Sequence, residues 1–333
     1  MMALSPRVFA ILMLLGISIF VVLQMLAQSP VPPTRENVKT AVQAPAEDTG
    51  KRIAFSFDDV PRGPGAFLQS QERPGLLLEA LRHGGIEQAA FFVNPGRITE
   101  SDSDAETVMR YAGEGHVLAN HTARHSRLSA VSVQTFLADI DAAEAWLLGR
   151  PNYRPWFRFP FLDEGGKNKA KRDAVRAGLR KRNLINGYVT VDASDWHMED
   201  LALAAAKNEK MMDWSALRDL FVESYVQSAN FSDELARRTL GRAPVQMILL
   251  HETDLAAMFV DDLAVALKAD GWEIVTADEA YADPMVDMEP DVAFADGTRT
   301  QMLAAERNIG SRWYQRNDPK VAKKLFAERV LRE

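Results

Sequence analysis

Two kinds of segment alternate along this 333-residue chain, and the alternation constrains the fold more than any other feature. Residues 89–93 (AAFFV) and 245–250 (VQMILL) are short and almost wholly apolar, which is typical of strands buried on both faces of a parallel sheet. Residues 133–148 instead repeat apolar side chains at helical spacing. The alternation of strand and helix predicts an α/β fold, either a barrel or an open parallel sheet.

About seven strands are expected, at residues 52–57, 89–93, 115–119, 156–161, 186–191, 245–250 and 271–276. Helices are expected at residues 74–83, 104–112, 133–148, 172–181, most of 198–238, and 254–268. Residues 172–181 are strongly basic, and we interpret their charges as a solvated helix face. The sequence has no repeat of fixed period, so a repeat architecture is not expected.

Charge and cysteine content narrow the chemistry that the chain can perform. The net charge of −7 argues against a nucleic-acid partner, because phosphate binding relies on clustered lysine and arginine. Cysteine is absent, which excludes a disulfide framework, a thiolate metal site and a cysteine nucleophile. Any metal ion must therefore be bound by histidine and carboxylate side chains.

The N-terminal region differs in composition from the rest of the chain. Residues 8–27 form an apolar run without a charge, preceded by Arg7, which predicts a signal peptide or a membrane anchor over residues 1–27. Residues 28–51 are rich in proline and polar residues, so we expect a flexible linker. The body of the protein is then exported, and is either periplasmic or membrane-anchored. Residues 281–333 form a charged C-terminal extension of unknown role.

The segment 119–125 (ANHTARH) places His121 and His125 four residues apart. On one helical turn both imidazoles would lie on the same side, where they could bind one divalent cation. The spacing alone does not distinguish such a pair from two surface histidines, and a metal site needs at least one further ligand.

Other chemical groups follow other expected strands, namely Asp58-Asp59, Arg158, Asp195 and His251. Each has an ordinary structural explanation when taken alone, but a barrel would bring them all to one rim. One carboxylate and two imidazoles there, with open positions for water and substrate, form a centre for metal-assisted hydrolysis. A second carboxylate can accept a proton from water, and a histidine can protonate the leaving group.

Five motifs stand in the order that is found in NodB-type polysaccharide deacetylases, carbohydrate esterase family four. They are residues 56–59 (SFDD), 115–125 (GHVLANHTARH), 158–161 (RFPF), 192–196 (DASDW) and 249–251 (LLH). The chain resembles this family over roughly residues 53–279. The resemblance implies a deformed (β/α) barrel of about seven parallel strands, with residues 52–280 as the catalytic domain. Val60 stands where the family usually has glycine.

The resemblance implies a catalytic role for four of the motif residues. Asp58 would be the general base, and Arg158 would hold and orient it. His251 would be the general acid, and a hydrogen bond to Asp195 would raise the pKa of this histidine.

The resemblance also implies a cofactor. Asp59, His121 and His125 would bind one divalent metal ion, most simply Zn²⁺, although Co²⁺ and Ni²⁺ also suit such ligands. Metal-bound water would then be the nucleophile.

The expected substrate is an N-acetylated polysaccharide or oligosaccharide, from which acetate is released. The backbone N–H of Phe161 would help to bind the developing oxyanion, and Trp196 and Leu249 would form walls of the acetyl pocket. We expect a monomer that contacts the membrane if its N-terminal segment is retained. Two alternatives are a hydrolase of the same fold acting on a non-sugar amide, and a catalytically silent glycan-binding protein.

Overall fold

The computed structural model describes residues 50–69, 71–98, 102–293 and 295–332. The expected signal peptide or anchor, and the linker up to residue 49, lie outside the described residues. Within the described part of the chain, no helix has both the length and the apolar character needed to cross a membrane.

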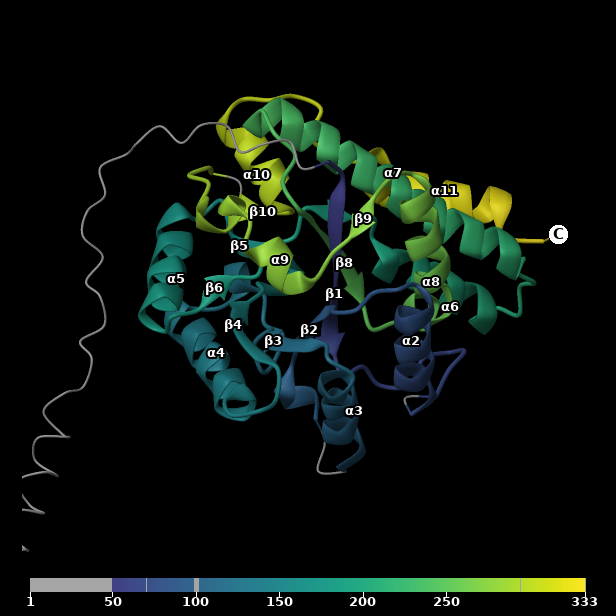
Figure 1. Cartoon of the computed structure of the whole chain (residues 1–333), viewed down its shortest axis with the longest axis horizontal. Coiled ribbons are helices and arrows are strands. Elements are labelled where there is room, and N and C mark those ends of the chain that lie inside the picture. Colours follow the sequence, from purple (N-terminus) through teal and green to yellow (C-terminus); the bar gives the residue numbers. More distant parts are fainter. Residues whose placement is uncertain (1–49, 70, 99–101, 294, 333) are drawn as a thin grey trace, which may run out of the picture. The chain divides into compact units, whose positions relative to one another are not determined.

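One parallel sheet forms the centre of the fold (Figure 1). Its strands are β1 (Arg52–Val60), β2 (Ala90–Val93), β3 (Val117–Asn120), β4 (Tyr153–Phe157), β6 (Ile185–Asn186), β7 (Val191–Asp192), β8 (Gln246–His251) and β9 (Glu273–Ile274). They are ordered β6-β4-β3-β2-β1-β8-β7, and β9 pairs with β1. In the described sheet β6 and β7 lie at opposite ends of this path, so the barrel is deformed and not fully closed, as the sequence predicts.

The expected single strand at residues 186–191 is wrong. Strands β6 and β7 are separate, and the residues between them cross from one end of the sheet to the other. Gly187 N–H donates to the carbonyl of Phe157 in β4, and Thr190 N–H donates to the carbonyl of Met247 in β8. Residues 188–190 are buried, as their pattern predicts. A buried segment that crosses the sheet has the same apolar pattern as a buried strand, so the pattern does not distinguish the two.

Helices surround the sheet: α2 (Glu72–His83), α3 (Asp102–Gly113), α4 (Val133–Leu147), α5 (Lys169–Lys181), α6 (Asp195–Lys207), α7 (Trp214–Leu240), α8 (Asp254–Ala269) and α9 (Ala277–Tyr281). Alternate strand residues point to two different cores. Phe57 and Phe91 stack with ring centroids 5.1 Å apart in the core shared with α2, α7 and α8. Phe92 belongs to a second core, which includes Tyr281 of α9. This alternation is the two-residue period of a strand buried on both faces.

The C-terminal segment packs onto this unit through five described elements. These are η4 (Pro284–Asp287), β10 (Ala295–Asp296), α10 (Arg299–Glu306), η5 (Gln315–Asn317) and α11 (Pro319–Arg329). Strand β10 pairs antiparallel with β5 (Asp163–Gly166), and α11 contacts α6 and α7. Residues 281–333 therefore contribute directly to the packing around the sheet.

The interpretation of the basic helix as a solvated face is wrong for two of its arginines. Arg172 and Arg176 are buried. Arg172 pairs with Asp173 and Asp291 at 2.7 Å, and Arg176 pairs with Glu164 at 2.6 Å. Two of these partners lie far enough from the helix in sequence that no local pattern reveals them, and a buried charge needs such partners.

We expect Phe326→Ala to lower the free energy of unfolding by about 3–5 kcal/mol, because this side chain of α11 is buried in the main core. Chemical denaturation measures the loss. Val321→Ala on the exposed side of the same helix is the control and should change stability by no more than about 0.5 kcal/mol. Equal stability of both variants would show that α11 does not pack as described.

Candidate functional site

The register of the parallel strands gathers the motif residues at one edge of the sheet. Asp58 at the end of β1 is the direct partner of His251 at the end of β8. On the other side of β1, β2 is followed in order by β3 and β4, so His121 and Arg158 also follow strand ends at this edge. Carboxyl ends of parallel strands are where α/β folds place their ligand sites.

Asp59, His121 and His125 form a cluster that could hold a metal ion. One potential ligand atom from each lies within 4.8 Å of the others. His125 Nε2 is 3.0 Å and His121 Nε2 is 3.7 Å from Asp59 Oδ1, a buried oxygen that accepts no hydrogen bond from the described residues. His121 Nδ1 lies 2.9 Å from the carbonyl oxygen of Arg158, and donating there leaves Nε2 as the free lone pair. This donor set fits a divalent cation.

The two histidines are not on a helical turn, so that expectation is wrong. They lie in an irregular loop in which Thr122 and His125 have positive φ of 61° and 58°. Asn120 Oδ1 accepts from Thr122 N at 2.8 Å, and Thr122 Oγ1 accepts from His125 N at 2.9 Å. These bonds hold the loop so that the centroids of the two imidazole rings are 4.9 Å apart. They also stabilise a backbone conformation that is costly for residues other than glycine.

Asp58 is buried and bound by a guanidinium that is itself fixed on several sides. Arg158 Nη1 donates to Asp58 Oδ1 at 2.6 Å and to Ser56 Oγ at 2.8 Å. Arg158 Nε donates to Gly187 O at 2.7 Å, and its Nη2 donates to Tyr281 Oη at 2.8 Å. The direction of the Asp58 carboxylate is therefore set by contacts from distant parts of the chain.

His251 is held by Asp195 through two hydrogen bonds. Its Nδ1 lies 2.8 Å from Asp195 Oδ1, and its backbone N–H donates to Asp195 Oδ2 at 2.7 Å. With Nδ1 engaged, the other ring nitrogen, Nε2, remains for the cavity.

Burial and neighbouring charges give the three histidines of the site different protonation states. Burial lowers the pKa of His121 and of His125 to about 3, so both are neutral at pH 7, as metal ligands must be. Burial also disfavours the charged form of His251, but the Asp195 carboxylate outweighs it and raises the pKa of His251 to about 9. Burial raises the pKa of Asp58, and the Arg158 guanidinium opposes this shift.

An open cavity of about 450 Å³ lies over these groups. Eight of the ten site residues predicted from the sequence line it: Asp58, Asp59, His121, His125, Phe161, Trp196, Leu249 and His251. The other two, Arg158 and Asp195, lie behind the cavity wall and hydrogen-bond to Asp58 and His251. The structure therefore brings all ten together.

Sequence reasoning did not identify several residues of the cavity or of its support. Arg62, Arg127, Leu162, Asp192 and Asp200 also line the cavity, and Tyr281 contacts Arg158. Arg62 and Arg127 stand a few residues beyond the SFDD and His-containing motifs, which is the signal that could have found them. Tyr281 has no such signal, because only the tertiary fold brings α9 to the site.

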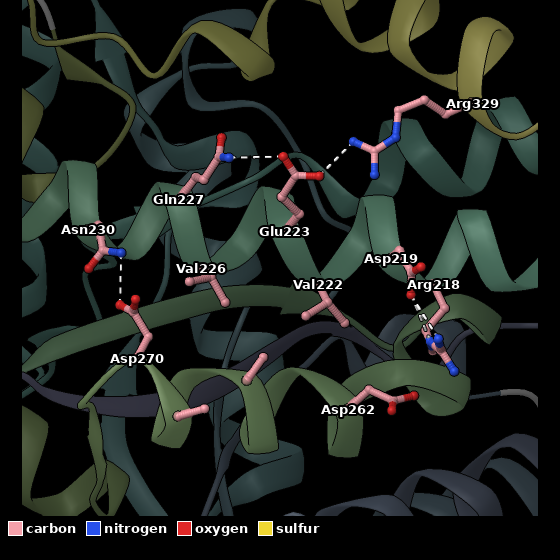
Figure 2. A pocket seen from close by; sticks show the side chains of 12 residues that line it. Arg218, Asp219, Val222, Glu223, Val226, Gln227, Asn230, Asp262, Asp270 and Arg329 are labelled. Carbon is pink, nitrogen blue, oxygen red and sulfur yellow. Dashed lines mark hydrogen bonds and ion pairs between the residues drawn. The ribbon is translucent and has the colours of Figure 1, made fainter.

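A larger depression of about 860 Å³ lies elsewhere, between α7 and α8. Figure 2 shows that its polar side chains bind one another: Glu223 contacts Gln227 and Arg329, and Asn230 contacts Asp270. None of the described histidines lines it. Histidine and aspartate side chains that could take part in catalysis line the smaller cavity instead.

The fold is of the α/β class and its cavity contains a cluster that could hold a metal ion. Comparison with known proteins indicates which family the chain resembles. The model of the polysaccharide deacetylase family matches residues 46–181. That span includes Asp58, Asp59, His121, His125 and Arg158, whereas Asp195 and His251 lie beyond it. This match agrees with the resemblance to polysaccharide deacetylases that the five motifs indicate.

Individual relatives are similar at a lower level. The chain is 26% identical over 244 residues to a peptidoglycan-N-acetylglucosamine deacetylase, PgdA, of Listeria monocytogenes, covering 73% of this chain and 41% of that protein. It is 26% identical over 144 residues to a peptidoglycan-N-acetylglucosamine deacetylase of Bacillus cereus, covering 43% and 46%. Both matches thus span less than half of the relative's length.

Among solved structures, the peptidoglycan deacetylase PdaC of Bacillus subtilis is similar with a TM-score of 0.44 and 23% sequence identity. The match covers 70% of this chain and 91% of that structure.

His125→Ala should weaken Zn²⁺ binding by at least about 100-fold, because it removes one of the three side chains that could hold the ion. Isothermal titration of the metal-stripped protein measures the affinity. His83→Ala, which changes an exposed histidine of α2, is the control and should bind Zn²⁺ like the unaltered protein. Undiminished binding by His125→Ala would show that the ligand set is wrong.

Proposed function

We propose that this protein is a metal-dependent deacetylase that hydrolyses an N-acetyl group on a glycan and releases acetate. The single observation that carries the proposal is the placement of Asp58 and His251 in direct register beside the cluster of Asp59, His121 and His125. A base, an acid and a metal site then face one cavity, which is the set that amide hydrolysis requires.

In the proposed reaction, Asp59, His121 and His125 would hold a divalent cation, which when bound would supply Lewis-acid stabilisation and would lower the pKa of water. Asp58 accepts a proton from the water molecule whose oxygen attacks the acetamide carbon. The Phe161 backbone N–H helps to stabilise the negative charge that develops on the carbonyl oxygen. When the carbon–nitrogen bond breaks, His251 donates its proton to the amine nitrogen, which leaves acetate and a free amine.

The surroundings of the base and acid support these roles. Asp58 must be ionised to accept a proton, and the guanidinium of Arg158 at 2.6 Å stabilises its charged form. His251 must be protonated to donate, and Asp195 stabilises the imidazolium. We assign Arg158 and Asp195 as the residues that orient and tune the two proton-transferring groups.

Exposed aromatic side chains favour a glycan over a small non-sugar amide. Phe161 is 47% and Trp196 is 44% exposed, and both line the open cavity. Such rings offer apolar surface to the faces of sugar residues. The names of the Listeria and Bacillus relatives support peptidoglycan as the kind of glycan. A silent glycan-binding protein is disfavoured, because every base, acid and ligand position is occupied by a competent side chain.

We also propose where the protein works and how it is organised. The apolar run at residues 8–27 and a cell-wall glycan substrate both fit an exported protein, periplasmic or tethered to the membrane through residues 1–27. Residues 52–280 form the catalytic domain of a monomer, Zn²⁺ is the metal, and residues 281–333 are an extension that packs on this domain.

Asp58→Asn should reduce kcat for acetate release by at least about 100-fold, because an amide cannot accept the proton. The metal content should stay at one ion per chain, since Asp58 is not among the three ligands. Acetate assay and elemental analysis of the same preparation give both quantities. Full activity of this variant would remove Asp58 from the role of base.

Asp195→Asn should move the high-pH limb of kcat/KM to lower pH. The unaltered protein should lose activity as the pH rises through the pKa of His251, about 9, where the acid loses its proton. Without the Asp195 charge the pKa of His251 falls by about 1–3, so the decline of kcat/KM begins at a correspondingly lower pH. Asp200→Asn, which changes an exposed carboxylate of the same cavity, is the control. An identical shift in both variants would contradict the specific pairing with His251.

A further inference from the structure

Arg127 presents a guanidinium in the wall of the catalytic cavity. Its guanidinium carbon lies 4.2 Å from the centroid of the Phe161 ring, and both residues line the cavity. Among the described residues, this guanidinium takes part in no hydrogen bond or ion pair. Stacking on an aromatic ring restricts the guanidinium while leaving its N–H groups free to donate.

Arg62 presents a second guanidinium to the same cavity from a firmly held loop. Its backbone N–H donates to Glu252 Oε2 at 2.7 Å, and Arg73 Nη1 donates to the carbonyl oxygens of Arg62 and Gly63 at 3.3 and 2.9 Å. Arg73 is in turn paired with the buried Asp254 at 2.7 Å. The position of Arg62 is therefore built into the fold.

The charge around the metal cluster is locally positive, although the chain carries a net charge of −7. Arg62 Nη1 lies 3.1 Å from Asp59 Oδ2, and Arg97 Nη2 lies 3.3 Å from Asp59 Oδ1. One carboxylate thus faces two guanidiniums while it also belongs to the metal cluster. Arg127 adds a third cation to this side of the cavity, where its charge also stabilises the ionised form of the Asp296 carboxylate.

The acidic side chains of the cavity lie toward another part of the sheet. Asp192 ends β7 at one end of the strand order, and Asp200 belongs to α6, which follows it. Arg127 and Phe161 instead follow β3 and β4, toward the opposite end. A glycan lying across the cavity would therefore meet cations and carboxylates at different positions.

We propose that Arg127, together with Arg62, binds the carboxylate of a sugar next to the acetamido sugar that is deacetylated, so the substrate is an acidic glycan. The inference rests on the proposed function, since it names the substrate class of that site. A guanidinium offers a planar pair of N–H donors that matches a carboxylate, and such charge-assisted hydrogen bonds are stronger than neutral ones.

The test compares two oligosaccharides that differ at one group. One has an acetamido sugar beside a sugar that carries a carboxylate, and the other has that carboxylate reduced to a primary alcohol. Arg127→Gln should raise the KM ratio of the acidic to the reduced oligosaccharide by roughly 10- to 100-fold. Arg124→Gln changes an exposed arginine of the same loop that does not line the cavity, and should leave the ratio unaltered. An unaltered ratio in Arg127→Gln, or an equal change in both variants, would overturn the proposal.

Binding without turnover separates the failure of this inference from failure of the proposed function. Calorimetric titration of the metal-stripped protein gives the affinity for each oligosaccharide. If the unaltered protein prefers the acidic oligosaccharide and Arg127→Gln abolishes that preference, the carboxylate site is supported. If the protein with metal bound then releases no acetate, deacetylation is refuted while the carboxylate site still stands. A preference that survives in Arg127→Gln contradicts the carboxylate site whatever the activity.

Discussion

The buried ion pair between Arg158 and Asp58 is the contact on which the rest of the site depends. A buried charge is costly without a partner, so the two side chains fix each other at 2.6 Å. The same arginine accepts a hydrogen bond from His121 through its backbone carbonyl, and thereby turns the free Nε2 of that ring toward the metal cluster. One residue thus orients both the proposed base and a proposed ligand, and Tyr281 ties it to the C-terminal segment.

Two further physical features prepare the site for chemistry. Asp59, Thr122, His125, Phe161 and Ser194 all have positive φ, a conformation that is costly for side chains with a Cβ and that concentrates at functional sites. Packing and hydrogen bonds of the surrounding sheet maintain this strain. Unequal surroundings also give the histidines different protonation states. Burial outweighs the nearby Asp59 carboxylate and keeps His121 and His125 neutral, whereas the Asp195 carboxylate keeps His251 charged.

The sequence predicted the features that local pattern encodes. The apolar runs at residues 89–93 and 245–250 correctly located β2 and β8, and motif residues after several strands correctly predicted one shared edge. Contacts between distant segments were not predictable in this way. The crossing segment at residues 187–190 has the same apolar pattern as a strand. Arg172 and Arg176 are paired with Asp291 and Glu164, which lie outside their helix. His121 and His125 have helical spacing, but side-chain hydrogen bonds favour an irregular loop, and Tyr281 reaches the site only through tertiary packing.

The most direct test of the account is acetate release from N-acetylated glucosamine oligomers and peptidoglycan by the purified protein. The protein is assayed after metal stripping and again after Zn²⁺ or Co²⁺ is restored. Metal-dependent deacetylation should give no acetate from the stripped protein and recovered acetate release once the metal is bound. Absence of acetate from every glycan, in protein shown to hold one metal ion per chain, would contradict glycan deacetylation.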